Sequence, residues 1–105
     1  MTEARALSSR EINFIARMLE GEHEHLADGL NRALVTPMND GGMGSLRFTA
    51  PEPKRHFGRQ IAEQNFADSD GVGVSAAVFV DQLGDLFELD VFKGDFSPLL
   101  ALPEI

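Results

Sequence analysis

The chain has 105 residues and contains no cysteine, no tryptophan and no tyrosine. Without cysteine there is no disulfide framework, no thiolate nucleophile and no cysteine-ligated zinc site. The eight aromatic residues are all phenylalanine. A phenylalanine ring has no hydrogen-bonding group, so we expect these rings in a core rather than on a nucleic-acid-binding platform.

Long apolar stretches are missing too. No run approaches the ~20 residues that a membrane-spanning helix needs. Residues 1–14 alternate between polar and apolar types and lack the hydrophobic region of a signal peptide. We therefore expect a cytoplasmic protein without a membrane partner. The length and the ordinary shares of apolar (43%) and charged (25%) residues predict a single domain over residues 1–105.

Basic side chains are almost absent from the C-terminal part of the chain. Residues 60–105 contain one, Lys93, against nine acidic side chains, whereas residues 1–59 contain eight of each. The whole net charge of −8 therefore lies in the last 46 residues. The electric field of this negative charge repels phosphate backbones, which argues against nucleic acid as a partner. It favours a basic protein surface or a cation, or it serves only as a solvated face that aids solubility.

The first predicted element is a helix over residues 9–20. Ser8 and Glu11 have the spacing of a capping box, and Leu7 and Ile12 have that of a hydrophobic staple. Apolar residues then recur at helical spacing until Gly21, which is a typical stop. The pattern predicts an amphipathic helix.

The rest of the chain reads as strands, at about 33–38, 45–50, 59–67, 72–80 and 86–93. Residues 59–67 contain good helix formers, but the turn signal Asp68-Ser-Asp-Gly71 that follows favours a strand there. The fold class is therefore α+β, with an N-terminal amphipathic helix packed on a four- or five-stranded antiparallel meander. The apolar C-terminal tail, residues 96–105, is expected to pack across the domain or to form a homodimer contact.

Strand alternation assigns residues to the two faces of this sheet. We expect one side of residues 72–80 to face the core, together with Phe87, Leu89 and Val91. The opposite face then contains Glu88 and Asp90, and with them Leu86 and Phe92.

The segment Asp40–Ser45 has three glycines within four positions, which allow positive φ and close backbone approach. A phosphate-binding loop would lead into a helix and usually supply a lysine, and this loop does neither. A hairpin connection is the simpler interpretation. The candidate binding residues here are Asp40, Gly41, Gly42, Met43, Gly44 and Ser45.

Glu88 and Asp90 share one strand face, with Cβ atoms roughly 7 Å apart. Such a pair could do acid–base work or hold a divalent cation, although a polar outer face explains it equally well. Lys93 and Asp95 complete the candidate binding residues. The sequence shows no nucleophile set, and His23 and His25 have no third ligand, so we predict no catalytic residues, no metal site and no cofactor.

Three blocks of sequence together resemble a known family. They are Asp40–Leu46 (DGGMGSL), Leu86–Lys93 (LFELDVFK) and Asp95–Leu99 (DFSPL). The family consists of short, mostly bacterial proteins known only as a domain of unknown function, and the resemblance covers residues 7–103. It implies no activity. It does imply that the glycine-rich loop and the acidic last strand belong to one recurring feature. The family more often has tryptophan where Phe92 stands here.

Two functions remain open. The first is an interaction module that binds a basic protein partner through the acidic C-terminal hairpin. The second is a divalent-metal-dependent enzyme or small-ligand binder that uses Asp40, Glu88 and Asp90 beside the glycine-rich loop.

Overall fold

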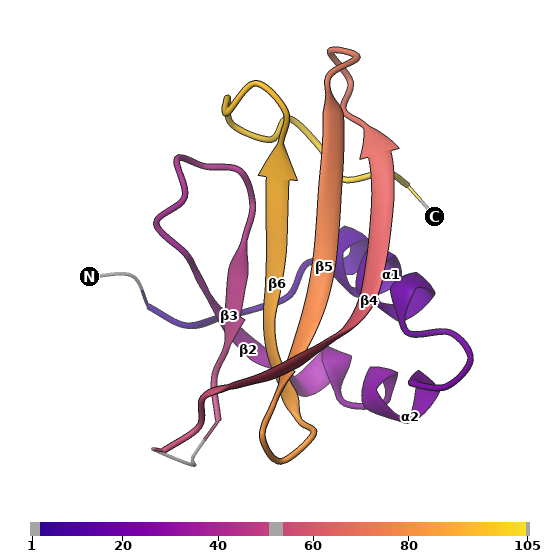
Figure 1. The fold of residues 1–105 in the computed structure, drawn as a ribbon, viewed down its shortest axis with the longest axis vertical. Coiled ribbons are helices and arrows are strands. Elements are labelled where there is room, and N and C mark those ends of the chain that lie inside the picture. The colour runs from indigo at the N-terminus through magenta and orange to yellow at the C-terminus, as the bar shows by residue number, and fades with distance from the viewer. Residues whose placement is uncertain (1–2, 51–53, 105) are drawn as a thin grey trace.

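The computed structural model describes residues 3–50 and 54–104 of the chain (Figure 1). It contains six strands and two α-helices within these residues, joined by one short 3-10 helix, η1. In chain order the elements are β1 (Arg5–Ala6), α1 (Ser9–Met18), α2 (Glu24–Ala27), η1 (Leu30–Arg32), β2 (Leu34–Pro37), β3 (Leu46–Phe48), β4 (Phe57–Ala67), β5 (Gly73–Asp81) and β6 (Leu86–Lys93).

The strands form one antiparallel sheet in the order β1-β2-β3-β6-β5-β4. The α+β class is confirmed, but the sheet has six strands, and the expected simple meander is wrong. β3 pairs with β6 instead of β4, so the chain crosses to the far edge after β3. Arg55 holds this crossover: its guanidinium forms an ion pair with Asp81 and donates to the carbonyl oxygens of Phe48 and Leu86.

The predicted capping box begins α1. The Ser8 hydroxyl accepts from the Glu11 amide at 3.1 Å, and the Glu11 carboxylate accepts from the Ser8 amide at 2.8 Å. The helix ends at Met18, two residues earlier than expected. It is also not the first element, because β1 precedes it. Arg5 donates two hydrogen bonds to Glu11, and Arg5 and Ala6 pair with β2.

The hydrophobic core lies between α1 and one face of the sheet. Its central side chains are Phe14 and Ile15 of α1 and Leu19 at the end of that helix, packed with alternate residues of β2, β3, β5 and β6. Figure 1 shows α1 behind β4 and β5, with α2 at the lower right of the sheet. No described helix covers the other face of the sheet, which we call the open face. Its residues are Arg47, Ser75, Ala77, Phe79, Glu88, Asp90 and Phe92.

One end of β6 departs from the expected alternation. Val80 pairs with Leu86 and Phe79 pairs with Glu88, so Phe87 is an extra residue in a β-bulge. Leu86 therefore packs against the core, contrary to the prediction. Phe87 is buried but lies outside the main hydrophobic cluster. The guanidinium carbons of Arg47 and Arg55 lie 4.5 and 5.1 Å from the centre of its ring.

The ambiguous segment 59–67 is a strand, as predicted. β4 forms one edge of the sheet and pairs only with β5. Most of its side chains are exposed, which explains why polar helix formers such as Gln60, Glu63 and Gln64 are tolerated there. No helix among the described residues has the length and apolar character to cross a membrane.

Gly58 is required by the close approach of β4 to β5. A Cβ atom at this position would lie 2.3 Å from the carbonyl oxygen of Asp81. We expect Gly58→Ala to force the two strands apart and to lower the free energy of unfolding by about 1–3 kcal/mol. Chemical denaturation would measure the loss. Gly73→Ala in β5 is the matched control, because a Cβ there meets no atom within 4 Å. Equal stability of the two variants would contradict the assignment.

Candidate functional site

The glycine-rich loop joins β2 to β3 and is organised by Asp40. Its carboxylate accepts hydrogen bonds from the amides of Met43 (3.2 Å) and Ser45 (2.9 Å). Burial acts to raise the pKa of Asp40, but the hydrogen bonds from Ser45 and Met43 outweigh it, so the pKa lies below its ordinary value. Both carboxylate oxygens are therefore used within the loop. Asp40 stabilises the turn.

The glycines let this loop contact the C-terminal segment, residues 95–104. The carbonyl oxygen of Gly42 accepts from the Leu99 amide at 3.0 Å. A Cβ on Gly42 would lie 3.3 Å from Pro98, and one on Gly44 would lie 3.0 Å from the Leu99 side chain. Both glycines also have positive φ, at 82° and 103°. Backbone conformation and close packing thus account for the glycines without a bound ligand.

Ser45 connects the loop to the last strand. Its buried hydroxyl donates to the carbonyl oxygen of Val91 at 3.2 Å and accepts from the Val91 amide at 2.8 Å. Since the regular pairing of β3 with β6 involves only Leu46 and Arg47, Ser45 extends the contact by one position. The glycine-rich loop and the acidic strand therefore form one structural unit, as the resemblance implied.

Glu88 and Asp90 lie beside each other on the open face. Arg47, opposite Glu88 on β3, forms an ion pair with it at 2.7 Å. The side chain of Glu88 is only 13% exposed. Burial, followed by the proximity of the Glu88 carboxylate, raises the pKa of Asp90 to about 6, with a smaller contribution from Asp40 and opposition from Arg47. Three predicted site residues are thus electrostatic neighbours.

Lys93 lies inside the protein, away from the open face. Its side chain is fully buried, and its ammonium donates to Asp68 (2.8 Å), to Asp70 (2.7 Å) and to the carbonyl oxygen of Pro98 (3.3 Å). Burial acts to lower the pKa of Lys93, but its hydrogen bonds to Asp68 and Asp70 raise it above the ordinary value. In this position the ammonium cannot contact an external ligand.

Asp68 completes this buried cluster. Its carboxylate also accepts from the amides of Ser69 (2.7 Å), Leu100 (2.9 Å) and Ala101 (3.2 Å). Burial alone would raise the pKa of Asp68, but the hydrogen bonds from Leu100 and Lys93 hold it well below the ordinary range. The C-terminal segment is thereby fastened to the β4–β5 turn. Leu99 and Leu102 of this segment also pack against the core.

Asp95 shapes the turn after β6. Its carboxylate accepts from the hydroxyl of Ser97 (2.6 Å) and from the Ser97 amide (3.0 Å), and these hydrogen bonds lower its pKa. Phe96 in this turn is 70% exposed and has a positive φ of 66°. Its ring meets that of Phe92 edge to face, with centroids 5.2 Å apart. An exposed aromatic pair therefore lies beyond the acidic pair.

Arg47, Phe92 and Phe96 were not among the predicted site residues. Arg47 reaches Glu88 only through the β3–β6 pairing, which the expected meander does not contain. For Phe92 a signal existed, since alternation already placed it on the same face as Asp90. For Phe96 strand alternation offers no such signal, because the exposure of its side chain depends on the turn made by Asp95 and Ser97.

The described residues include no group of three histidine, aspartate or glutamate side chains arranged to hold a metal ion. Two of the acids of the site are also already engaged. Asp40 accepts two backbone hydrogen bonds, and Glu88 is held by Arg47.

The fold and the site define a small α+β domain whose glycine-rich loop, last strand and C-terminal segment form one unit. A family model described as "Domain of unknown function (DUF6984)" matches residues 4–103, and the chain belongs to this family. No curated protein and no solved structure matches the chain.

The raised pKa of Asp90 predicts a pH dependence of stability. Because the folded state binds this proton more tightly than the unfolded chain, the free energy of unfolding falls as the pH rises from about 4 to about 6. Asp90→Asn removes this contribution. Since the group is partly exposed, we expect the variant to gain about 1 kcal/mol over wild type at pH 7 and nothing at pH 4.

Denaturation curves at several pH values would measure this difference. Asp28→Asn, on the helix side of the molecule, is the matched control and should leave the pH profile of wild type unchanged. A profile for Asp90→Asn that runs parallel to wild type would contradict the assignment.

Proposed function

We propose that the domain is a protein-interaction module whose open face binds a basic segment of a partner. The observation that carries this proposal is the pair Glu88 and Asp90 on a sheet face that no described helix covers. Both side chains are partly buried, and they stand two residues apart on the same strand. A basic partner would relieve their mutual repulsion.

Such a partner would stabilise the ionised form of Asp90 most of all. The ion pairs among the described residues include Glu88 with Arg47 but none for Asp90. An arginine or lysine placed next to Asp90 would favour its ionised form and lower its pKa from about 6. A bound partner would therefore provide the ion pair that Asp90 lacks in the isolated domain. Arg47 would at the same time repel a misplaced basic side chain and so help to set the register.

Aromatic side chains provide the apolar contacts that an interface needs. Phe92 is 47% exposed and lies next to the acidic pair, in contact with Phe96. At the other end of the face, Phe79 contacts the exposed ring of Phe57. Interface energies concentrate in aromatic and arginine contacts surrounded by polar residues. We therefore expect a partner segment with basic residues flanked by apolar ones.

Charge reversal on the open face tests the proposal. We expect Glu88→Lys with Asp90→Lys to abolish capture of a basic partner from the source organism's lysate, because the face would then repel it. The milder pair Glu88→Gln with Asp90→Asn should weaken capture at least about tenfold. Affinity capture with quantitative mass spectrometry would measure both, and circular dichroism would check folding.

Glu22→Lys with Glu24→Lys provides the control. It makes the same change in net charge on the helix side, at two exposed positions. Capture by this variant should equal that of wild type. If the open-face variants retain the partner, or if the helix-side variant loses it equally, binding does not depend on Glu88 and Asp90 and the proposal is wrong.

A further inference from the structure

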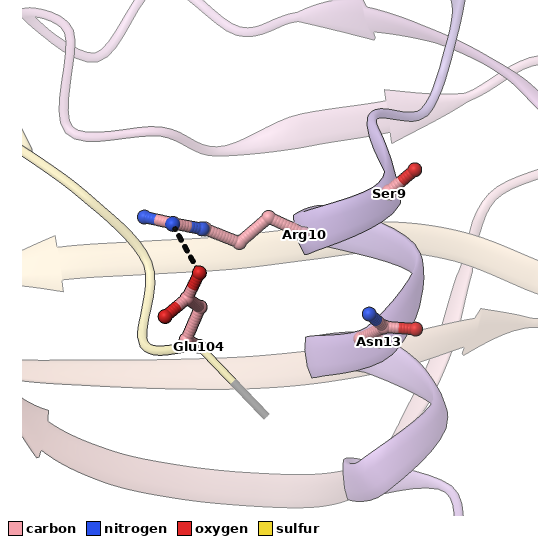
Figure 2. A pocket seen from close by; sticks show the side chains of 4 residues that line it. All are labelled: Ser9, Arg10, Asn13 and Glu104. Carbon is pink, nitrogen blue, oxygen red and sulfur yellow. Dashed lines mark hydrogen bonds and ion pairs between the residues drawn. The ribbon is translucent and has the colours of Figure 1, made fainter.

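Arginine side chains of this chain pair with carboxylates in two different settings. Figure 2 shows the simpler one, in which Arg10 of α1 reaches Glu104 at 3.2 Å. Both of these side chains are well exposed, so the ion pair contributes little to stability. Arg47 and Arg55 have a second contact besides their carboxylate. Their guanidinium carbons lie 4.5 and 5.1 Å from the centre of the Phe87 ring.

On the open face, the fold thus holds one guanidinium with both a carboxylate and a ring. Arg47 from β3 forms its ion pair with Glu88 at 2.7 Å and lies over the ring of the neighbouring residue on β6, Phe87. The ring adds cation–π attraction and apolar contact to the ion pair. A planar guanidinium can stack on a ring while it donates to a carboxylate, and an ammonium group does this less well.

The same two kinds of side chain recur further along β6. Asp90 and Phe92 both lie on the open face, two residues apart, with Cβ atoms separated by roughly 7 Å. Their partners on β5 are Ala77 and Ser75, whose small side chains leave space beside the carboxylate and the ring. None of the ion pairs between described residues involves Asp90. This second arrangement therefore has room for an arginine from another molecule.

Phe96 adds a second ring to the arrangement. It meets Phe92 edge to face, and both rings remain exposed, so ring faces are left for contact with a cation. The backbone of Phe96 has a positive φ of 66°, a conformation that costs a bulky residue stability. Hydrogen bonds from Ser97 to the Asp95 carboxylate fix this turn. The turn therefore keeps the ring at the surface, whereas phenylalanine is more often buried.

We propose that Asp90, Phe92 and Phe96 form a receptor for an arginine side chain of the partner protein. The guanidinium would donate to the Asp90 carboxylate and lie against the ring of Phe92, as Arg47 does with its own carboxylate and ring. This inference rests on the proposed function, and it narrows the basic segment of the partner to one that presents arginine. A lysine would form the ion pair but would gain less from the rings.

Three short peptides test this preference. They are acetyl-Ala-Leu-Arg-Leu-Ala-amide and its counterparts with lysine or citrulline in place of arginine; citrulline keeps the shape of arginine without its charge. Titration at a pH of about 7.5, where Asp90 is ionised, should shift the amide signals of residues 90–96. We expect the arginine peptide to bind about three to five times more tightly than the lysine peptide, and the citrulline peptide to bind most weakly.

Variants identify the groups that bind the peptide. Phe92→Leu should remove the preference for arginine, because leucine offers no ring face while the carboxylate of Asp90 remains. Asp90→Asn should weaken binding of the arginine and lysine peptides alike, by at least about fivefold. Phe57→Leu is the matched control, because Phe57 is a similarly exposed ring at the other end of the open face, and this variant should keep the preference. The dispersion of the amide signals reports the folding of each variant.

The inference is overturned if the lysine peptide binds as tightly as the arginine peptide, if the preference survives Phe92→Leu, or if millimolar arginine peptide leaves residues 90–96 unperturbed. Equal binding of the arginine and lysine peptides that is lost in Asp90→Asn would contradict the arginine receptor and still support a basic partner. Failure of the proposed function itself would appear in the capture experiment, as capture that survives charge reversal of Glu88 and Asp90.

Discussion

The buried ammonium of Lys93 connects three parts of the chain that are far apart in sequence. It joins the end of β6 to the β4–β5 turn through Asp68 and Asp70, and to the C-terminal segment through the carbonyl oxygen of Pro98. A buried charge is costly unless it is paired and hydrogen-bonded, so this geometry tolerates little change. Asp68 in turn binds the amides of Leu100 and Ala101. The C-terminal segment is consequently an integral part of the fold.

A second pair of a buried aspartate and a cation lies at the opposite end of the sheet. Each of the two hairpins formed by β4, β5 and β6 begins its turn with an aspartate and has a glycine of positive φ three residues later, Gly71 or Gly84. In each case the aspartate is buried and pairs with a cation, Lys93 for Asp68 and Arg55 for Asp81. One cluster holds the C-terminal segment, and the other holds the crossover after β3. The open face therefore lies on a sheet that is held at both ends.

Local signals were sufficient for the helix and for most strands. The capping box at Ser8 and Glu11 gave the start of α1, and the turn signal after Ala67 gave β4 its strand assignment. Topology could not be predicted in this way, because the β3–β6 pairing depends on the crossover and on the buried position of Arg55. The bulge at Phe87 likewise changes which face of the sheet Leu86 lies on, and no pattern of residues in the sequence predicts this bulge.

The candidate site was predicted in part, for a physical reason. Alternation placed Glu88 and Asp90 on one face because it is a local property of a strand. The role of Lys93 was not foreseeable, since an isolated lysine among acids reads as a surface residue until the fold brings Asp68 and Asp70 to it. A hairpin connection was already the simpler interpretation of the glycine-rich loop, and its contacts with Pro98 and Leu99 show in addition that it packs against the C-terminal segment.

The most direct measurement is amide hydrogen exchange of the wild-type protein, resolved at Leu99, Leu100 and Ala101. If the Lys93–Asp68 cluster fastens the C-terminal segment, these amides, which donate to Gly42 and Asp68, exchange orders of magnitude more slowly than in an unfolded chain. Their protection should approach that of the central strand β5. Exchange at the rates of an unfolded peptide, with β5 still protected, would show that the segment is not held and would contradict the account.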